Sequence, residues 1–244
     1  MAEWYKDWFN TTYYHVLYKD RDHDEAKEFI RHLYAYLNLR PYQKTLDLAC
    51  GRGRHALFLN QLGLDTVGVD LSKESIRYAK KFEKEGLRFA VHDMRDPLPG
   101  EKFDVVLNLF TSFGYFGSLS ENGKVLRSIA SYLKKEGDLI IDFMNVVKVK
   151  KHLDEQAEEV KNVEGINFEI KKSMDQGCIV KTISFQDKEE HFRFREKVQA
   201  LTLSDFEKLL GENGFNLINK FGDYQLNEFS IEQSERLIIH AKLK

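Results

Sequence analysis

Short apolar runs alternate with amphipathic stretches between residues 40 and 145. The apolar runs predict strands, which fall at 45–50, 65–69, 87–91, 103–110 and 138–143. Between them, apolar residues recur at helical spacing and predict helices at 54–62, 72–84 and 122–134. Strands and helices that alternate with short connections are typical of a doubly wound parallel sheet. We therefore predict an α/β fold.

The pattern changes before this region. Residues 24–39 add one more amphipathic helix, which ends ahead of Pro41. Residues 1–23 instead hold seven large aromatic rings with no clear period. So many rings in a short stretch are rarely left in water. We expect this segment to pack on the domain, over the functional site.

The pattern changes again after residue 145. A charged helical stretch, 147–158, precedes strand-like segments that follow one another through tight connectors. They predict an antiparallel meander inserted into the α/β chain, and we expect residues 147–200 to form a lid. Residues 201–244 predict a helix capped by Ser204 and then two antiparallel strands. The whole chain is thus predicted to be one domain with its core at 24–145.

Composition narrows the possible partners. Lys and Arg number 37 and Asp and Glu 39, a net charge of −2, so we expect no nucleic-acid surface. Cys50 and Cys178 belong to no C-x-x-C or Cys/His cluster, so we predict neither a metal site nor a disulfide. No apolar run reaches membrane-spanning length and the first residues are no signal peptide. We therefore expect a cytoplasmic protein without a membrane partner.

The stretch DLACGRGRHA, residues 47–56, has the chemistry of a cofactor loop. It reads G-x-G-x-x-A between a predicted strand and a predicted helix, and Asp70 ends the next strand at the spacing of a ribose-binding acid. NAD(P) and S-adenosylmethionine both suit these features. Asp47 separates them, because a carboxylate repels a pyrophosphate but attracts an ammonium or sulfonium. The negative charge of Asp47 favours S-adenosylmethionine as the cofactor. The alternative is NAD(P), which would make the protein an oxidoreductase.

Several motifs in order resemble the class I S-adenosylmethionine-dependent methyltransferases. DLACGRG is followed by VGVDLS at 67–72, HDM at 92–94, FDVVLNLF at 103–110 and LKKEGDLIIDFMN at 133–145. The resemblance covers residues 40–145 and is closest to the small-molecule enzymes of the family. It implies a seven-stranded doubly wound sheet whose last strand is antiparallel to the others.

The resemblance also implies which residues bind the cofactor. They are Asp47, Cys50, Gly51, Gly53, Arg54, Asp70, Leu71, Asp93, Met94 and Leu109. Asp70 would hold the ribose hydroxyls, while Asp93 would accept a hydrogen bond from the adenine amino group. Leu109 would present its carbonyl to the cofactor ammonium, and Arg54 would contact its carboxylate. Taken alone, Asp70 also suits a helix cap, Asp93 a loop acid, and Arg54 a surface salt bridge.

The acceptor is expected beyond the carboxyl ends of the strands, where open α/β sheets bind their ligands. The chain lacks the proline motif of the DNA amino-methyltransferases and any appended basic domain, so a small molecule is the expected substrate. The candidate substrate-binding residues are Tyr14, Thr111, Phe113, Phe116, Arg193 and Arg195. Arg193 and Arg195 alternate with phenylalanines along a strand and would face either the cleft or water.

The chemistry of transfer depends on the acceptor atom. An amine needs only a free lone pair, whereas a hydroxyl benefits from a general base. The candidate catalytic residues are Tyr18, Tyr115 and His191. The sequence does not decide whether the acceptor atom is nitrogen or oxygen, and it leaves the oligomeric state open. It also allows that the protein binds the cofactor without catalysing a reaction.

Overall fold

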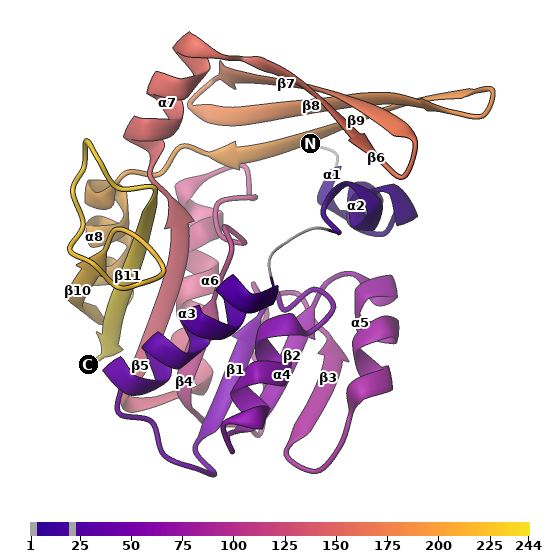
Figure 1. Ribbon diagram of the computed structural model, residues 1–244. Coiled ribbons are helices and arrows are strands. Elements are labelled where there is room, and N and C mark those ends of the chain that lie inside the picture. Colours follow the sequence, from indigo (N-terminus) through magenta and orange to yellow (C-terminus); the bar gives the residue numbers. More distant parts are fainter. Residues whose placement is uncertain (1–3, 20–22) are drawn as a thin grey trace.

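The computed structural model describes residues 4–19 and 23–244. In these residues a seven-stranded sheet has the order β10-β11-β5-β4-β1-β2-β3 (Figure 1). Its strands are β1 (Lys44–Leu48), β2 (Asp65–Asp70), β3 (Leu87–Val91), β4 (Phe103–Asn108), β5 (Leu133–Met144), β10 (Phe215–Phe221) and β11 (Arg236–Leu243). Strand β11 is antiparallel to both β5 and β10. The predicted fold class, including the reversed last strand, is confirmed.

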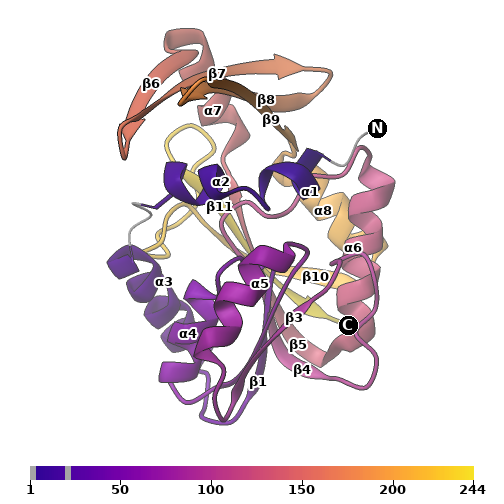
Figure 2. The same cartoon turned by 90° about the vertical axis from the view of Figure 1, so that its right-hand side faces the viewer.

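Helices cover both faces of this sheet (Figure 2). One face carries α3 (His23–Tyr36), α4 (Arg54–Gln61), α5 (Lys73–Ala79) and the short 3-10 helix η1 (Lys80–Phe82), and the other carries α6 (Leu119–Tyr132) and α8 (Leu203–Glu212). The helices form where apolar residues recur on one side, as at Phe29, Ile30 and Leu33 of α3, all of which are buried. Central strands are buried on both faces, as expected for parallel strands between helix layers.

Helix α8 corrects one sequence prediction. Its N-cap is Thr202 rather than Ser204, because Thr202 and Asp205 satisfy each other's backbone N–H groups in a capping box. A threonine followed three residues later by an acid was the signal for this earlier start.

The inserted meander is a second sheet, with the strand order β6-β7-β8-β9. It follows α7 (Val146–Glu155) and comprises β6 (Glu158–Val163), β7 (Ile166–Asp175), β8 (Cys178–Asp187) and β9 (Glu190–Gln199). All of its pairings are antiparallel, and it lies above the carboxyl ends of the core strands (Figure 1). The sequence prediction recognised β7 to β9 but took the start of β6 for helix, because its residues EEVKNV bury only Val163.

The N-terminal helices lie between the two sheets (Figure 1). Helices α1 (Trp4–Trp8) and α2 (Thr12–Leu17) place Trp8 and Leu17 in an apolar cluster with Phe168, Ile183 and Phe185 of the lid. Residues 1–3 and 20–22 of the predicted N-terminal segment, 1–23, lie outside the described residues. In the described part of the chain, helices that combine the length and apolarity needed to cross a bilayer are absent.

Candidate cofactor and acceptor site

The loop that joins β1 to α4 is shaped by its glycines. Gly51 and Gly53 have φ angles of 55° and 81°, in the left-handed region. The Gly53 N–H donates to the Cys50 carbonyl at 2.9 Å. A Cβ atom at Gly53 would lie 2.5 Å from the ring of Phe89 on β3, so glycine is required there by conformation and by packing. Gly53 thus seats the loop on β3, and Gly51 lies at the cavity.

Asp70, at the end of β2, connects two segments of the backbone through hydrogen bonds. One carboxylate oxygen accepts from Gly51 N and the other from Ser72 N, both at 2.8 Å. Burial raises the pKa of Asp70, and these two hydrogen bonds oppose the rise. The cap of α5 is Ser72 itself, whose hydroxyl accepts from Ser75 N at 3.1 Å. Asp70 therefore fixes the loop while its carboxylate lines the cavity.

Asp47 lies beneath the loop. Its side chain is 1% exposed and accepts a hydrogen bond from Ala56 N, in the first turn of α4, at 3.0 Å. Burial raises its pKa to about 7, and the Ala56 bond partly offsets the rise. Asp47 and Gly53 do not line the cavity, so neither lies where it would touch a ligand directly. Asp47 can act on a bound ligand only through the electric field across the loop.

A cavity of about 390 Å³ opens above the loop, within the usual size range for small-molecule sites. Eight of the predicted cofactor residues line it: Cys50, Gly51, Arg54, Asp70, Leu71, Asp93, Met94 and Leu109. Two acids therefore stand at the ends of adjacent strands, with an apolar side chain directly after each. These two acceptors and two apolar side chains fit a nucleoside, whose hydroxyls and amino group donate hydrogen bonds and whose base offers flat apolar faces.

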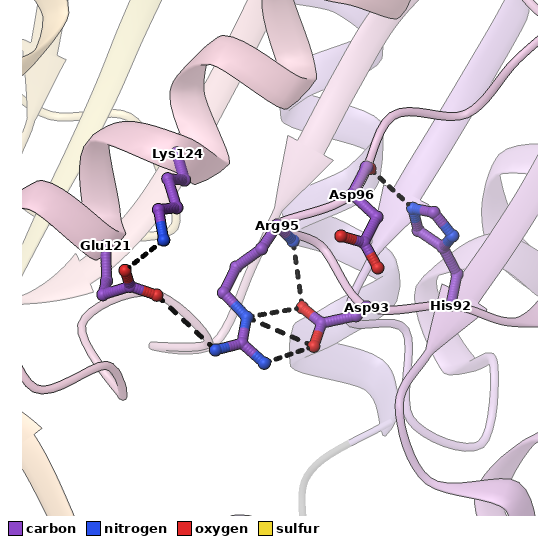
Figure 3. Close-up of polar contacts among 6 residues, drawn as sticks. All are labelled: His92, Asp93, Arg95, Asp96, Glu121 and Lys124. Atoms are coloured by element: carbon purple, nitrogen blue, oxygen red, sulfur yellow. Dashed lines mark hydrogen bonds and ion pairs between the residues drawn. The ribbon is translucent and has the colours of Figure 1, made fainter.

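Asp93 is held by Arg95 (Figure 3). Arg95 Nε donates to Asp93 Oδ1 at 3.0 Å, and Nη2 donates to Oδ2 at 2.6 Å. The same guanidinium lies 4.7 Å from the ring centre of Phe116 and 3.6 Å from a carboxylate oxygen of Glu121. The backbone N–H of Arg95 also donates to Oδ1, at 3.0 Å, so Arg95 fixes the orientation of the Asp93 carboxylate at the cavity.

Aromatic side chains form the opposite wall of the cavity. They are Tyr5, Phe9, Tyr14, Tyr18, Tyr115 and Phe116. The ring of Phe9 contacts Tyr14 at 4.9 Å and Tyr115 at 5.5 Å between centres. Ser72 Oγ donates to Asn10 Oδ1 at 2.8 Å and links this wall to the start of α5. The N-terminal segment and the loop after β4 thus enclose one chamber.

A family model described as a methyltransferase domain matches residues 40–199. The chain belongs to this family. S-adenosylmethionine is therefore the cofactor, as the charge of Asp47 favoured, and the NAD(P) alternative is set aside.

Similar proteins of known name or structure agree with the methyltransferase fold. The chain is 27% identical over 208 residues to YqeM of Bacillus subtilis (strain 168), covering 82% of this chain and 83% of that one. It is 29% identical over 224 residues to the glycine/sarcosine/dimethylglycine N-methyltransferase of Actinopolyspora halophila, covering 85% of this chain and 37% of that enzyme. A crystal structure of an S-adenosylmethionine-dependent methyltransferase from Clostridium acetobutylicum ATCC 824 superposes with a TM-score of 0.80 at 25% identity, covering 95% and 96% of the two chains.

Two predicted substrate residues of this methyltransferase lie outside the cavity. Phe113 is fully buried and packs 5.6 Å from Phe206 of α8, so it belongs to the core. Thr111 accepts a hydrogen bond from Arg236 at 2.9 Å and does not line the cavity. A loop rich in rings must bury some of them. Phe116 of this loop and Tyr14 of α2 are predicted substrate residues that do line the chamber.

The lid does not bring His191, Arg193 or Arg195 to the site: all three are exposed and none of them lines the cavity. Alternate residues of a strand face opposite sides, and the side that carries Phe192 and Phe194 is the one that packs inward, on the N-terminal rings. The arginine face is therefore the water face.

Sequence reasoning missed a polar group on the inner side of the lid. Glu196 accepts from Trp8 Nε1 at 2.7 Å and from the Tyr18 hydroxyl at 2.9 Å. Lys181, directly opposite Glu196 on β8, donates to the same hydroxyl. Glu196 lies two residues after the inward-facing Phe194 on the same strand, so strand alternation could have predicted that it also faces inward.

Two arginines of the loop also lie at the cavity. The Arg52 guanidinium sits 4.6 Å from the ring centre of Tyr78, and neither residue was predicted. Arg54 lies 5.5 Å from the ring centre of Phe110, just beyond β4. The loop after β1 is thus stacked against rings from α5 and from the loop after β4.

Proposed function

We propose that this methyltransferase transfers a methyl group to a nitrogen of a small molecule. The observation that carries the proposal is the continuous cavity, which joins the cofactor residues to the rings of Phe9, Tyr14 and Tyr115. S-adenosylmethionine, when bound, supplies a methyl group already activated by its sulfonium. The chain therefore has to align the acceptor and exclude water, and a ring-lined chamber suits both tasks.

The cofactor contacts belong to the same proposal. Asp70 would receive the ribose hydroxyls, and Asp93 the adenine amino group, with Leu71 and Met94 against the base. Asp47 would add negative potential below the methionine end. The support is placement: Asp70 and Asp93 both present carboxylates to one cavity, and both are already oriented by N–H groups of the chain.

Two of the three candidate bases are not available to a hydroxyl acceptor, which supports nitrogen over oxygen. His191 is exposed on the lid, and the Tyr18 hydroxyl gives its single proton to Glu196. Tyr115 lines the chamber, but a neutral amine would not need its hydroxyl. The similar enzyme of Actinopolyspora halophila is by its name an N-methyltransferase, which supports the same choice.

A matched acceptor panel tests the proposal. The protein is incubated with S-adenosylmethionine carrying a deuterated methyl group, and with small amines each paired with its hydroxyl analogue. Mass spectrometry should find label in the amines. Label confined to the hydroxyl members would make oxygen the acceptor. Binding of S-adenosylhomocysteine without any transfer would favour a non-catalytic family member.

A further inference from the structure

The loop after β4 has an unusual backbone. Phe110 and Thr111 have φ angles of 61° and 59°, so two successive residues with side chains are left-handed. A residue with a side chain is strained in this region and persists there only where its surroundings enforce it. Leu109, Phe110 and Ser112 line the cavity, so this strained turn shapes part of the cavity wall.

Asp142 near the end of β5 holds both residues of the turn. Its carboxylate Oδ2 accepts from Phe110 N at 2.8 Å, and its backbone carbonyl accepts from Thr111 N at 2.9 Å. The side chain of Asp142 is 1% exposed, so water does not compete for these bonds. Tyr224 also donates to Oδ2, at 3.3 Å.

Arg236 completes the arrangement from the neighbouring strand. Its Nε donates to Asp142 Oδ1 at 2.8 Å, and its Nη2 donates to Thr111 Oγ1 at 2.9 Å. Arg236 is the first residue of β11, which is antiparallel to β5, so the reversed strand delivers it to the carboxyl end of the sheet. Neither Asp142 nor Arg236 lines the cavity.

We propose that the buried Asp142–Arg236 pair is a positioning device for methyl transfer, which holds Phe110 and Thr111 left-handed and so sets the acceptor-side wall. This inference rests on the proposed transfer to a small molecule. The pair acts through the turn and touches no reacting atom. Its loss should therefore impair turnover more than cofactor binding.

The same two strands supply a matched control. At their opposite end Asp138 accepts from His240 Nε2 at 2.8 Å and lies 3.3 Å from Lys242 Nζ. Asp138→Asn therefore breaks an ion pair between β5 and β11 as Asp142→Asn does, but far from the turn. Arg236→Lys is a milder third variant, which keeps the charge and removes the forked geometry.

The first measurement is hydrogen exchange of the backbone amides at 109–113, followed by mass spectrometry. Asp142→Asn and Arg236→Lys should raise exchange there at least ten-fold, and Asp138→Asn should not. Equal protection in all proteins, or equal loss in all three variants, would overturn the proposal. This readout needs no substrate, so it stays valid if the acceptor is not an amine.

The second measurement separates positioning from simple loss of structure. The substrate is the compound that takes up most label in the acceptor panel. In the folded Asp142→Asn or Arg236→Lys variant, kcat for this compound should fall by roughly 10- to 100-fold, the scale of an error of about 1 Å in alignment. Calorimetric affinity for S-adenosylhomocysteine should stay within a few-fold of the wild type. An unchanged kcat, or a loss of affinity that matches the loss of kcat, would contradict the assignment.

Discussion

The carboxyl group of Asp47 should make the stability of this methyltransferase depend on pH. Burial raises its pKa from an ordinary 3.8 to about 7. The folded chain then binds this proton more tightly than the unfolded chain, so the stability contribution is complete below pH 4. It is lost as the pH rises to 7. One pKa unit corresponds to about 1.4 kcal/mol, so the full loss is on the order of 4 kcal/mol.

Asp47→Asn removes this titration while keeping a side-chain oxygen for the Ala56 N–H. Urea unfolding at pH 5 and pH 8 should show the wild type losing about 3 kcal/mol more stability between the two pH values than the variant does. Glu85→Gln, an exposed carboxyl-to-amide change, serves as the control and should keep the wild-type slope.

The same variant tests the electrostatic role of Asp47. Asp47→Asn should weaken S-adenosylhomocysteine binding at pH 8, because the negative potential below the loop is gone. If the free energy of unfolding changed equally between pH 5 and pH 8 in the variant and the wild type, the reasoning about the burial of Asp47 would be refuted. An unchanged affinity at pH 8 would refute the reasoning about the cofactor.

The remaining predictions concern other parts of the site. Asp70→Asn should weaken S-adenosylhomocysteine binding roughly 10- to 100-fold in calorimetry, since hydrogen bonds to a charged group contribute about 1.5 to 3 kcal/mol; an effect below three-fold would remove it from the cofactor site. Gly53→Ala should destabilise the protein in urea more than Gly165→Ala, because both have positive φ but Gly165 has open space around it; equal losses would mean that contact with Phe89 is unimportant. Glu196→Gln should loosen the N-terminal helices from the lid and shift tryptophan fluorescence to longer wavelength, whereas the exposed Arg195→Gln should not; an unshifted spectrum would contradict that contact.

Local sequence was sufficient to predict that most of the proposed cofactor residues lie at one cavity. The glycine loop and the acids after β2 and β3 each depend on a strand end and the residues that follow it. Parallel strands bring such ends to one edge, so Asp70 and Asp93 could be assigned to one cavity before any coordinates. Asp47 was predicted to bind the cofactor, but packing buries it below the loop and outside the lining of the cavity.

The acceptor half was decided by tertiary structure. Whether Phe113 or Phe116 faced the chamber depended on where α8 packs, and the lid arginines pointed to water because the rings on their opposite side had a partner in the N-terminal segment. Glu196 meets Tyr18, and Arg236 meets Asp142, across 178 and 94 residues of chain. Such pairs leave no local periodicity, since they form only when a reversed strand or an inserted sheet brings distant residues together. The sequence alone thus determined the fold and the cofactor, and the packing of sheets and rings determined the walls around the acceptor.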